Sequence, residues 1–196
     1  MASYVGIAST CEAIVRLLRS SYEPAQFSGA TLDFQVYVAE DFTHPMDEGV
    51  SVFLYRIYHN GNNRIPAGRM TPDGRKQAAR LPVELHFLLT AWARKASLQH
   101  EIAGWMMRVM EDNAILTASV LNAYRPNVFR DDEGVSVGLT DLSVEDMFRV
   151  WEVMISHVYQ LSVPYHARVL ELDSLIPPLP PGRPVQERVS DMREVE

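Results

Sequence analysis

Residues 81–111 read LPVELHFLLTAWARKASLQHEIAGWMMRVME, and this stretch decides the fold class. From Val83 to Ala91 almost every residue is apolar, so a strand here needs cover on both faces, or on one face and by a partner protein. The second half repeats apolar residues at helical spacing, at Leu98, Ile102, Trp105, Met106, Val109 and Met110. A buried strand that leads directly into an amphipathic helix, with no catalytic loop between them, predicts a packed domain of helices and strands.

The length and composition are those of an ordinary globular domain. The chain has 196 residues, of which 47% are hydrophobic and 22% charged, so it can bury a core. A formal net charge of -7 argues against a nucleic-acid partner, which usually meets a basic face. The sequence holds no apolar run of about eighteen residues, so we expect no membrane span.

The chemical character of the chain changes after Leu175. The segment IPPLPPGRP, residues 176–184, favours extended polyproline II, and the charged VQERVSDMREVE follows it. We therefore predict one domain over residues 1–175 and a Pro-rich, charged C-terminal tail over residues 176–196.

Residues 4–21 have the pattern of an amphipathic helix of the mature fold. Glu12, Arg16 and Arg19 interrupt its apolar run, so a signal peptide is not expected. Cys11, the only cysteine in the sequence, falls on the apolar face, which favours a buried small side chain over a catalytic thiol. A lone cysteine allows no intrachain disulfide and fits a reducing, cytosolic setting.

Further segments alternate apolar and polar residues as half-buried strands do, over residues 31–38, 50–58, 134–140 and 163–173. In the strand predicted over residues 50–58, one face should carry Val50, Val52 and Leu54, and the other face Phe53, Tyr55 and Ile57. In the strand predicted over residues 163–173, Tyr165 and Ala167 should point to the face opposite His166, Arg168 and Leu170. These patterns predict an α+β fold, with a mixed, mostly antiparallel sheet of about five strands flanked by helices.

Two more helices complete the expected fold. Residues 113–127 have the pattern of a short helix that Pro126 ends. Another helix begins at Ser143, a good N-cap, and Asp146 three residues later completes a capping-box pattern. Its expected core face carries Phe148, Trp151 and Ile155.

Two loops stand out by their charge. Residues 39–49 form an acidic loop. Residues 64–80 are basic and contain two prolines and two glycines, so this segment is either a solvated loop or one that reaches a binding partner.

The sequence offers no catalytic, cofactor-binding or metal-binding signature. None of its six histidines is spaced from another as metal ligands are, and no Walker loop, G-x-G-x-x-G or G-x-S-x-G motif occurs. His86 and His166 fall on strands that could be neighbours, and structural roles are expected for both. We therefore predict no enzyme activity, no cofactor and no metal.

Aromatic and arginine side chains are frequent on the strands and their ends. Such residues are the usual anchors of protein interfaces. The candidate interface residues are Tyr55, Arg56, Tyr58, Arg64, Arg69, Trp92, Tyr165 and Arg168. For Trp92, interface and core remain open alternatives, whereas core packing is expected for Trp105 and Trp151. Arg56 and Arg168 lie within apolar strands, so each is expected to pair with a carboxylate, within the chain or across a subunit boundary.

The order of these segments resembles a family of phage-tail-like proteins, the tube-cap or tail-terminator proteins of extracellular contractile injection systems. The stretches that carry the resemblance are IASTCEAIVRLLRSSY, GVSVFLYRIYHNGNNR, LPVELHFLLTAWA, HEIAGWMMRVMEDNAIL, LTDLSVEDMFRVW and LSVPYHARVLELD. They extend from residue 4 to about residue 173, and the most specific are FLYRIYHN, LHFLLTAWA and VPYHARV. Larger members carry more chain after this domain, and Gln160 stands where a basic residue is expected.

The resemblance implies a tail-terminator-like fold and a structural role. It implies a homo-oligomeric ring of six subunits on the distal end of the inner tube, where it stops polymerisation. Tube and sheath proteins would be the partners, in a particle assembled in the cytoplasm. The loop over residues 59–80 would reach neighbouring subunits, so deleting residues 65–78 is expected to leave the monomer folded and to break ring or tube contacts.

Two other classes of function remain as alternatives. One is a monomeric adaptor that binds peptides or proteins through an exposed sheet edge, or through its PPLPPGRP segment. The other is a small hydrolase or transferase with His86 or His166 as base, which requires a deep pocket with converging polar groups.

Overall fold

The computed structural model describes residues 2–60, 80–154 and 159–175. These residues form one six-stranded sheet in the order β1-β2-β3-β6-β5-β4. Its strands are β1 (Asp33–Tyr37), β2 (Gly49–His59), β3 (Leu81–Trp92), β4 (Ile115–Thr117), β5 (Gly134–Leu139) and β6 (Ser162–Leu172). Only β1 and β2 pair in parallel. The predicted mixed, mostly antiparallel sheet flanked by helices is therefore confirmed.

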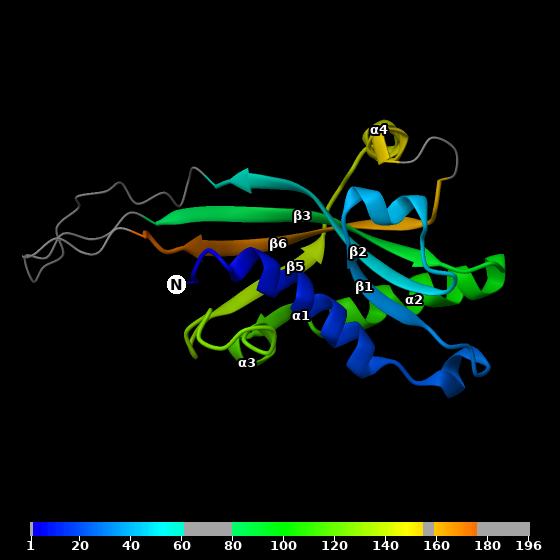
Figure 1. Ribbon diagram of the computed structural model, residues 1–196, viewed down its shortest axis with the longest axis horizontal. Coiled ribbons are helices and arrows are strands. Elements are labelled where there is room, and N and C mark those ends of the chain that lie inside the picture. Colours follow the sequence, from blue (N-terminus) through cyan, green and yellow to red (C-terminus); the bar gives the residue numbers. More distant parts are fainter. Residues whose placement is uncertain (1, 61–79, 155–158, 176–196) are drawn as a thin grey trace, which may run out of the picture.

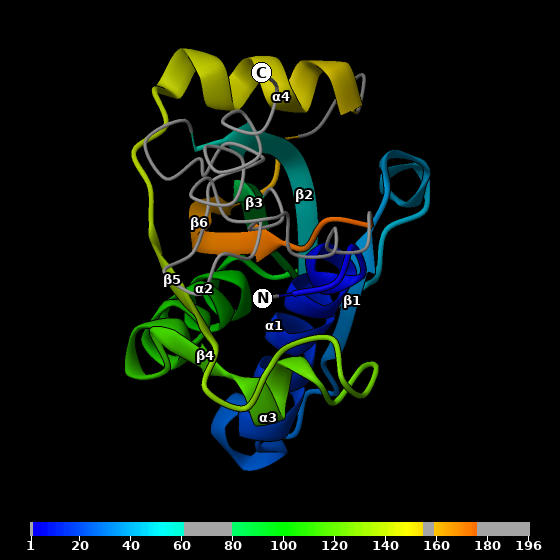
Figure 2. The same ribbon diagram turned by 90° about the vertical axis from the view of Figure 1, so that its left-hand side faces the viewer.

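Helices cover the two faces of the sheet unequally (Figures 1 and 2). One face carries α1 (Gly6–Ser21), α2 (Ala96–Asp112) and α3 (Ala118–Leu121). The other carries α4 (Val144–Met154) and the short 3-10 helix η2 (Ala39–Thr43), both above one half of the sheet. A second 3-10 helix, η1 (Pro24–Phe27), follows α1. Among the described residues, helical cover is thus more extensive on the first face than on the second.

The main core lies between the sheet and α1, α2 and α3. On β3, alternate residues point into it and are buried: Val83, Leu85, Phe87, Leu89 and Ala91. Ile102, Met106 and Met110 come from the apolar stripe of α2, as its spacing predicts. Trp105 packs at the edge of this core, with ring centroids 5.5 Å from Phe27 and 5.9 Å from Phe34. The long apolar run therefore forms the central strand of the domain.

A second, smaller cluster lies on the other face, where η2 and α4 cover the sheet. It consists of Tyr37, Phe42, Trp92 and Trp151, with their rings in contact. The indole Nε1–H of Trp92 donates a 2.8 Å hydrogen bond to Ser51 Oγ, which satisfies this buried polar group. Both faces of β3 are therefore buried at this end of the sheet, as its apolar run requires.

Cys11 and the N-terminus of α4 match their predictions. Cys11 is buried within α1, and burial, together with the charge of Glu12, raises the pKa of its thiol to about 12. This favours the neutral thiol. At the start of α4, the Asp146 N–H donates to Ser143 Oγ at 3.0 Å, and the Ser143 hydroxyl donates to the Asp146 carboxylate at 2.7 Å. The predicted N-cap is therefore present, and the Asp146 carboxylate bonds to the Ser143 hydroxyl rather than to its backbone N–H as in a capping box.

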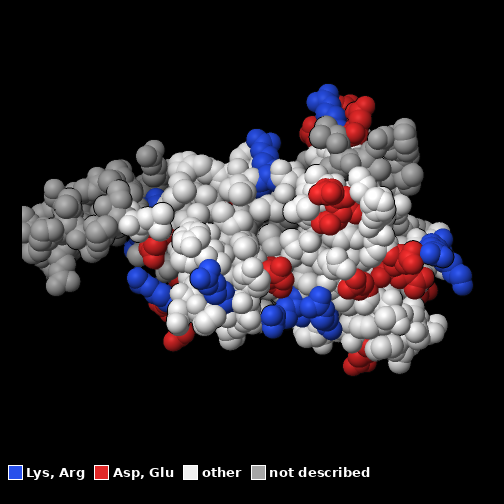
Figure 3. Space-filling view, viewed as in Figure 1, with Lys and Arg blue, Asp and Glu red and all other residues white. Residues whose placement is uncertain are grey.

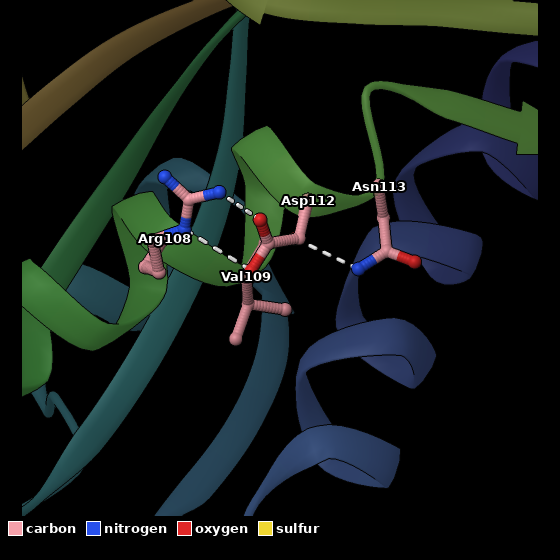
Figure 4. Close-up of polar contacts among 4 residues, drawn as sticks. All are labelled: Arg108, Val109, Asp112 and Asn113. Atoms are coloured by element: carbon pink, nitrogen blue, oxygen red, sulfur yellow. Dashed lines mark hydrogen bonds and ion pairs between the residues drawn. The ribbon is translucent and has the colours of Figure 1, made fainter.

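Side chains at the C-terminus of α2 bond to each other and to one of the last helical backbone carbonyls (Figure 4). Arg108 Nε donates a 3.1 Å hydrogen bond to the Asp112 carboxylate one turn later, and the same two side chains form an ion pair. Asn113 donates through Nδ2 to the Val109 carbonyl at 2.9 Å, which satisfies one of the last carbonyls of the helix. Arg108 and Asp112 thus form an exposed, self-contained pair.

Three expectations about local structure are wrong. The predicted helix over residues 113–127 is replaced by β4 and the four-residue α3, because Ile115 and Leu116 pair with β5 and Leu116 fills the main core. Phe148 is 52% exposed, because only one turn of α4 reaches the small cluster. Leu170 points into the main core together with Ala167, because the β3–β6 pairing shifts register between Val83 and Leu85.

Several predictions concern residues outside the described ranges. The structure does not describe the proposed tail over residues 176–196. It also does not describe most of the basic loop, which includes Arg64 and Arg69. Ile155, expected on the core face of the last helix, also lies outside the described ranges.

Candidate assembly surface

Away from α4 and η2, the described residues place no helix above the second face of the sheet (Figure 1). Seven side chains from three neighbouring strands occupy this region, which we call the open sheet face: Tyr55, Arg56, Tyr58, Glu84, His86, His166 and Arg168. The surface is polar and aromatic, in contrast to the apolar face beneath it. An uncovered sheet face rich in tyrosine and arginine is typical of a protein contact.

A register shift in β2 brings these side chains together. Between Leu54 and Arg56 the strand gains one residue relative to β3, so Arg56 stands directly opposite His86. Tyr55 also approaches His86, with ring centroids 6.3 Å apart. Strict alternation predicts Tyr55 and Arg56 on opposite faces, and the shift places both beside the same histidine.

The members of the open sheet face form a continuous row of contacts. The Arg56 guanidinium lies 3.8 Å from the centroid of the Tyr58 ring, a cation–π contact. The Tyr58 ring meets His86 edge-on at 4.7 Å, and His86 is the direct cross-strand partner of His166, with 6.1 Å between the imidazole centroids. The two histidines are therefore neighbours in the sheet, a possibility that the sequence left open.

Glu84 is the carboxylate of this row. Its Oε2 lies 3.7 Å from Arg168 Nε, and its Oε1 accepts a 2.8 Å hydrogen bond from Asn60 Nδ2. The expectation that Arg168 meets a carboxylate is therefore confirmed within the chain. For Arg56 the described partner is the Tyr58 ring instead. Among the seven side chains of the open sheet face, Glu84 is the one carboxylate, beside two guanidinium groups and two imidazoles.

Partial burial lowers the pKa of both imidazoles. For His166, the positive charge of Arg168 and the neighbouring His86 lower the pKa further. For His86, Glu84 partly opposes the effect of burial, and Arg56 and Arg168 add to it. His166 Nδ1 is shielded from solvent and has no hydrogen-bond partner among the described residues. At neutral pH both side chains are therefore uncharged, and the face carries its positive charge on arginine.

The free energy of unfolding is expected to depend on these two histidines between about pH 7.5 and about pH 5.5. Their pKa values in the folded chain lie below the unfolded value of about 6.5, so the unfolded chain binds more protons in this range. Stability should therefore decrease as the pH falls. In urea denaturation across this pH range, His86→Gln/His166→Gln should lose less unfolding free energy than the natural sequence as the pH falls. The control is His100→Gln on the exposed surface of α2, and an equal loss in all three proteins would contradict the prediction.

Two of the candidate interface residues belong to the interior. Trp92 is 4% exposed and lies in the small cluster. Tyr165 is 2% exposed and stacks on Phe87 with an interplanar angle of 13°. Neither presents a surface to a partner, because Trp92 lies beneath η2 and α4 and Tyr165 points toward the helices of the first face.

The open sheet face thus contains Tyr55, Arg56, Tyr58 and Arg168 from the candidate set. Arg64 and Arg69 lie outside the described residues. The sequence did not assign Glu84 or the two histidines to the surface. Their alternation with the buried residues of β3 and β6 is the signal that could have placed them there.

An open groove of about 570 Å³ lies at the opposite end of β2 from the open sheet face. We call it the acidic groove, and its lining residues are Thr31, Asp33, Gln35, Tyr37, His44, Met46, Asp47, Glu48 and Arg94. Arg94 pairs with Asp47 at 2.7 Å, and Figure 3 shows acidic side chains gathered around η2 and the beginning of β2. In the described ranges, no three His, Cys, Asp or Glu side chains are placed to hold a metal ion, and no helix has the length and apolar content to cross a membrane.

Comparison with solved structures shows the same fold in two assemblies. The sheath/tube terminator of an extracellular contractile injection system, PVC, in its extended state, matches with a TM-score of 0.61 at 17% identity, over 91% of this chain and 60% of that one. The tube-terminating cap of the anti-feeding prophage matches with a TM-score of 0.58 at 12% identity, over 89% of this chain and 58% of that one. The chain therefore spans about 60% of the length of the terminator and of the cap.

Sequence comparison assigns the family. A search of curated proteins found no significant match. The family model described as the Pvc16 N-terminal domain matches residues 9–187, which is most of the sequence and includes every strand of the sheet. The chain belongs to the Pvc16 N-terminal domain family.

Proposed function

We propose that this chain is a structural cap of a contractile injection particle. It forms a ring on the distal end of the inner tube and stops tube polymerisation. The observation that carries the proposal is the match of nearly the whole domain to a sheath/tube terminator and to a tube-terminating cap. Copies of the chain, the inner tube protein and the sheath protein are the proposed partners, in a particle assembled in the cytoplasm. A ring of six subunits is the proposed stoichiometry.

The open sheet face has the properties that such a role requires. The end of a growing tube exposes the surface to which the next subunit binds, much as an open sheet edge exposes unpaired groups. A terminator binds this surface and presents no equivalent surface for further growth. Aromatic and guanidinium anchors on a rigid sheet suit this task, and no nucleophile or cofactor is needed.

Peptide addition at β1, one of the two edge strands of the described sheet, receives less support because the chain's own side chains already bond to backbone groups of this strand. The Phe34 N–H donates to Asp33 Oδ1 at 2.8 Å, and the Phe34 carbonyl accepts a 2.6 Å hydrogen bond from Arg19. At the end of the strand, the Val38 N–H donates to Asp41 Oδ2 at 2.7 Å. Addition of a peptide strand would have to displace these bonds.

The hydrolase alternative also lacks the arrangement that it requires. His86 and His166 lie on the open sheet face, and the acidic groove is lined by other residues. A general base acts most effectively within a pocket where polar groups converge on the substrate. The geometry therefore supports a structural role better than a catalytic one.

Electron microscopy of particles assembled with and without this chain tests the proposed function. Without it, we expect the length distribution of the inner tubes to broaden and extend to longer tubes, because nothing stops the addition of tube subunits. Supplying the natural chain should restore a defined length. Tubes of the same length distribution in both preparations would contradict a terminating role.

A further inference from the structure

The two charged surfaces of the chain have opposite signs and lie at opposite ends of one strand. The acidic groove adjoins Gly49, where β2 begins, and the open sheet face reaches Tyr58, near its end. A strand of 11 residues spans roughly 35 Å, so the two surfaces are well separated. Because they are different parts of the molecule, a contact between them in two copies is heterologous, the kind that generates rings or filaments.

The open sheet face has a cationic group available for a partner. Glu84 already engages Arg168 and Asn60, whereas no described carboxylate pairs with Arg56. The Arg56 guanidinium is held over the Tyr58 ring, which fixes its position and leaves its N–H groups able to donate to a carboxylate. The face is therefore a rigid, positively charged surface on a chain whose formal net charge is -7.

The acidic groove provides the matching surface. Asp33, Asp47 and Glu48 line it, and Glu40 and Asp41 of η2 lie nearby in the chain. Arg94 offsets part of this charge through its pair with Asp47. The parallel pairing of β1 with β2 holds the groove, because Asp33 is the register partner of Gly49. Both surfaces are thus built on the same sheet and keep a constant relation to each other.

We propose that the open sheet face of one copy docks on the acidic groove of the next copy. This inference rests on the proposed function and adds which two surfaces meet between subunits. Two copies that each carry a net negative charge repel each other unless oppositely charged surfaces meet, so charge complementarity selects this arrangement over contacts between like surfaces. Repetition of this single heterologous contact gives the proposed ring when the rotation between neighbouring copies closes on itself.

A charge-exchange experiment tests the pairing in the assembled system. Variant one is Arg56→Glu/Arg168→Glu, which makes the open sheet face acidic. Variant two is Asp47→Lys/Glu48→Lys, which makes the groove basic. The matched control is Arg108→Glu, which reverses an exposed arginine at the end of α2, away from both surfaces. Self-association is measured by sedimentation velocity, and capping by the length of tubes assembled with the inner tube protein.

Each variant tested by itself should self-associate at least about tenfold more weakly than the natural chain. Tubes assembled with a single variant should be longer than tubes assembled with the natural chain. An equimolar mixture should recover association and normal tube length, because the acidic face of one variant fits the basic groove of the other, and the reverse contact fits as well. The control should behave like the natural chain. Circular dichroism and urea unfolding check the fold. Should the first variant unfold, Arg56→Ala/Arg168→Ala replaces it in the test of single variants only, because a neutral face cannot restore association in the mixture.

The outcomes separate this inference from the proposed function. Single variants that associate and cap normally, or a mixture that shows no recovery, would overturn the pairing while the capping role stands. If Arg56→Glu/Arg168→Glu abolishes capping but leaves self-association intact, the open sheet face contacts the tube. That result would also overturn the pairing. A natural chain without effect on tube length would overturn the proposed function itself.

Discussion

Gly49→Ala is expected to destabilise the fold by about 3 kcal/mol or more, the range of severe single substitutions. Gly49 begins β2 with φ +148°, a backbone conformation that L residues rarely adopt. A Cβ at this position would lie 2.0 Å from the carbonyl oxygen of Asp33 and 2.7 Å from the backbone nitrogen of the same residue. These are backbone atoms of the paired strand, so relief requires β1 to move away from β2.

The consequences of this substitution reach both hydrophobic clusters. β1 contributes Phe34 to the main core and Tyr37 to the small cluster, and both are nearly inaccessible to solvent. Since small domains are stable by only about 5–15 kcal/mol, we expect a large fall in the urea midpoint and a poor yield of soluble protein.

Gly104→Ala is the matched control for Gly49→Ala. Gly104 lies in α2, and a Cβ there meets nothing within 4 Å. Alanine should stabilise this helix by roughly 0.5–1 kcal/mol through its higher helix propensity. Urea unfolding followed by circular dichroism compares the two variants. A Gly49→Ala protein as stable as the Gly104→Ala protein would show that the β1–β2 pairing tolerates a side chain at this position.

Phe87→Ala is expected to cost about 3–5 kcal/mol of unfolding free energy. Phe87 is 0% exposed on the central strand, with Leu54 and Tyr165 as its direct cross-strand partners. Removing its ring leaves a cavity at the centre of the sheet, which the rigid neighbouring strands cannot fill. The measurement is the urea unfolding curve, with the slope checked for a change in two-state behaviour.

Phe148→Ala serves as the control for Phe87→Ala. Phe148 is 52% exposed on α4, and its main described contact is the Tyr159 ring at a centroid distance of 5.3 Å. We expect a loss of about 1 kcal/mol or less, because little apolar area is removed from the interior. Comparable losses at both positions would mean that α4 belongs to the main cooperative core, contrary to the separation of the two clusters.

Local patterns in the sequence predicted those elements that are set by their own residues. The apolar run of β3 and the helical spacing of α2 specify a buried strand and an amphipathic helix whatever surrounds them. The Ser143 and Asp146 pair likewise specifies a helix start, because the capping hydrogen bond from the Asp146 N–H to Ser143 Oγ forms within one turn. The arginine and tyrosine residues that the sequence singled out on β2 lie toward its exposed end, and their role in an interface stays a prediction.

The elements that were missed depend on partners far away in the chain. β4 is a strand because Ile115 and Leu116 pair with β5, and a three-residue segment has too little periodicity to reveal this. The register shift that places Arg56 beside His86 arises from the pairing of β2 with β3. Neither strand shows such a shift by itself.

The sequence by itself determined the α+β class, the central strand and its helix, and the absence of recognisable catalytic motifs, because these follow from composition and local periodicity. Only the tertiary structure decided that Trp92 is covered while Arg56 is not. Both residues lie on the same face of the sheet, and the difference is that α4 and η2 lie above one half of that face. Which half of a face is covered depends on where distant segments pack, and no pattern within a strand encodes that.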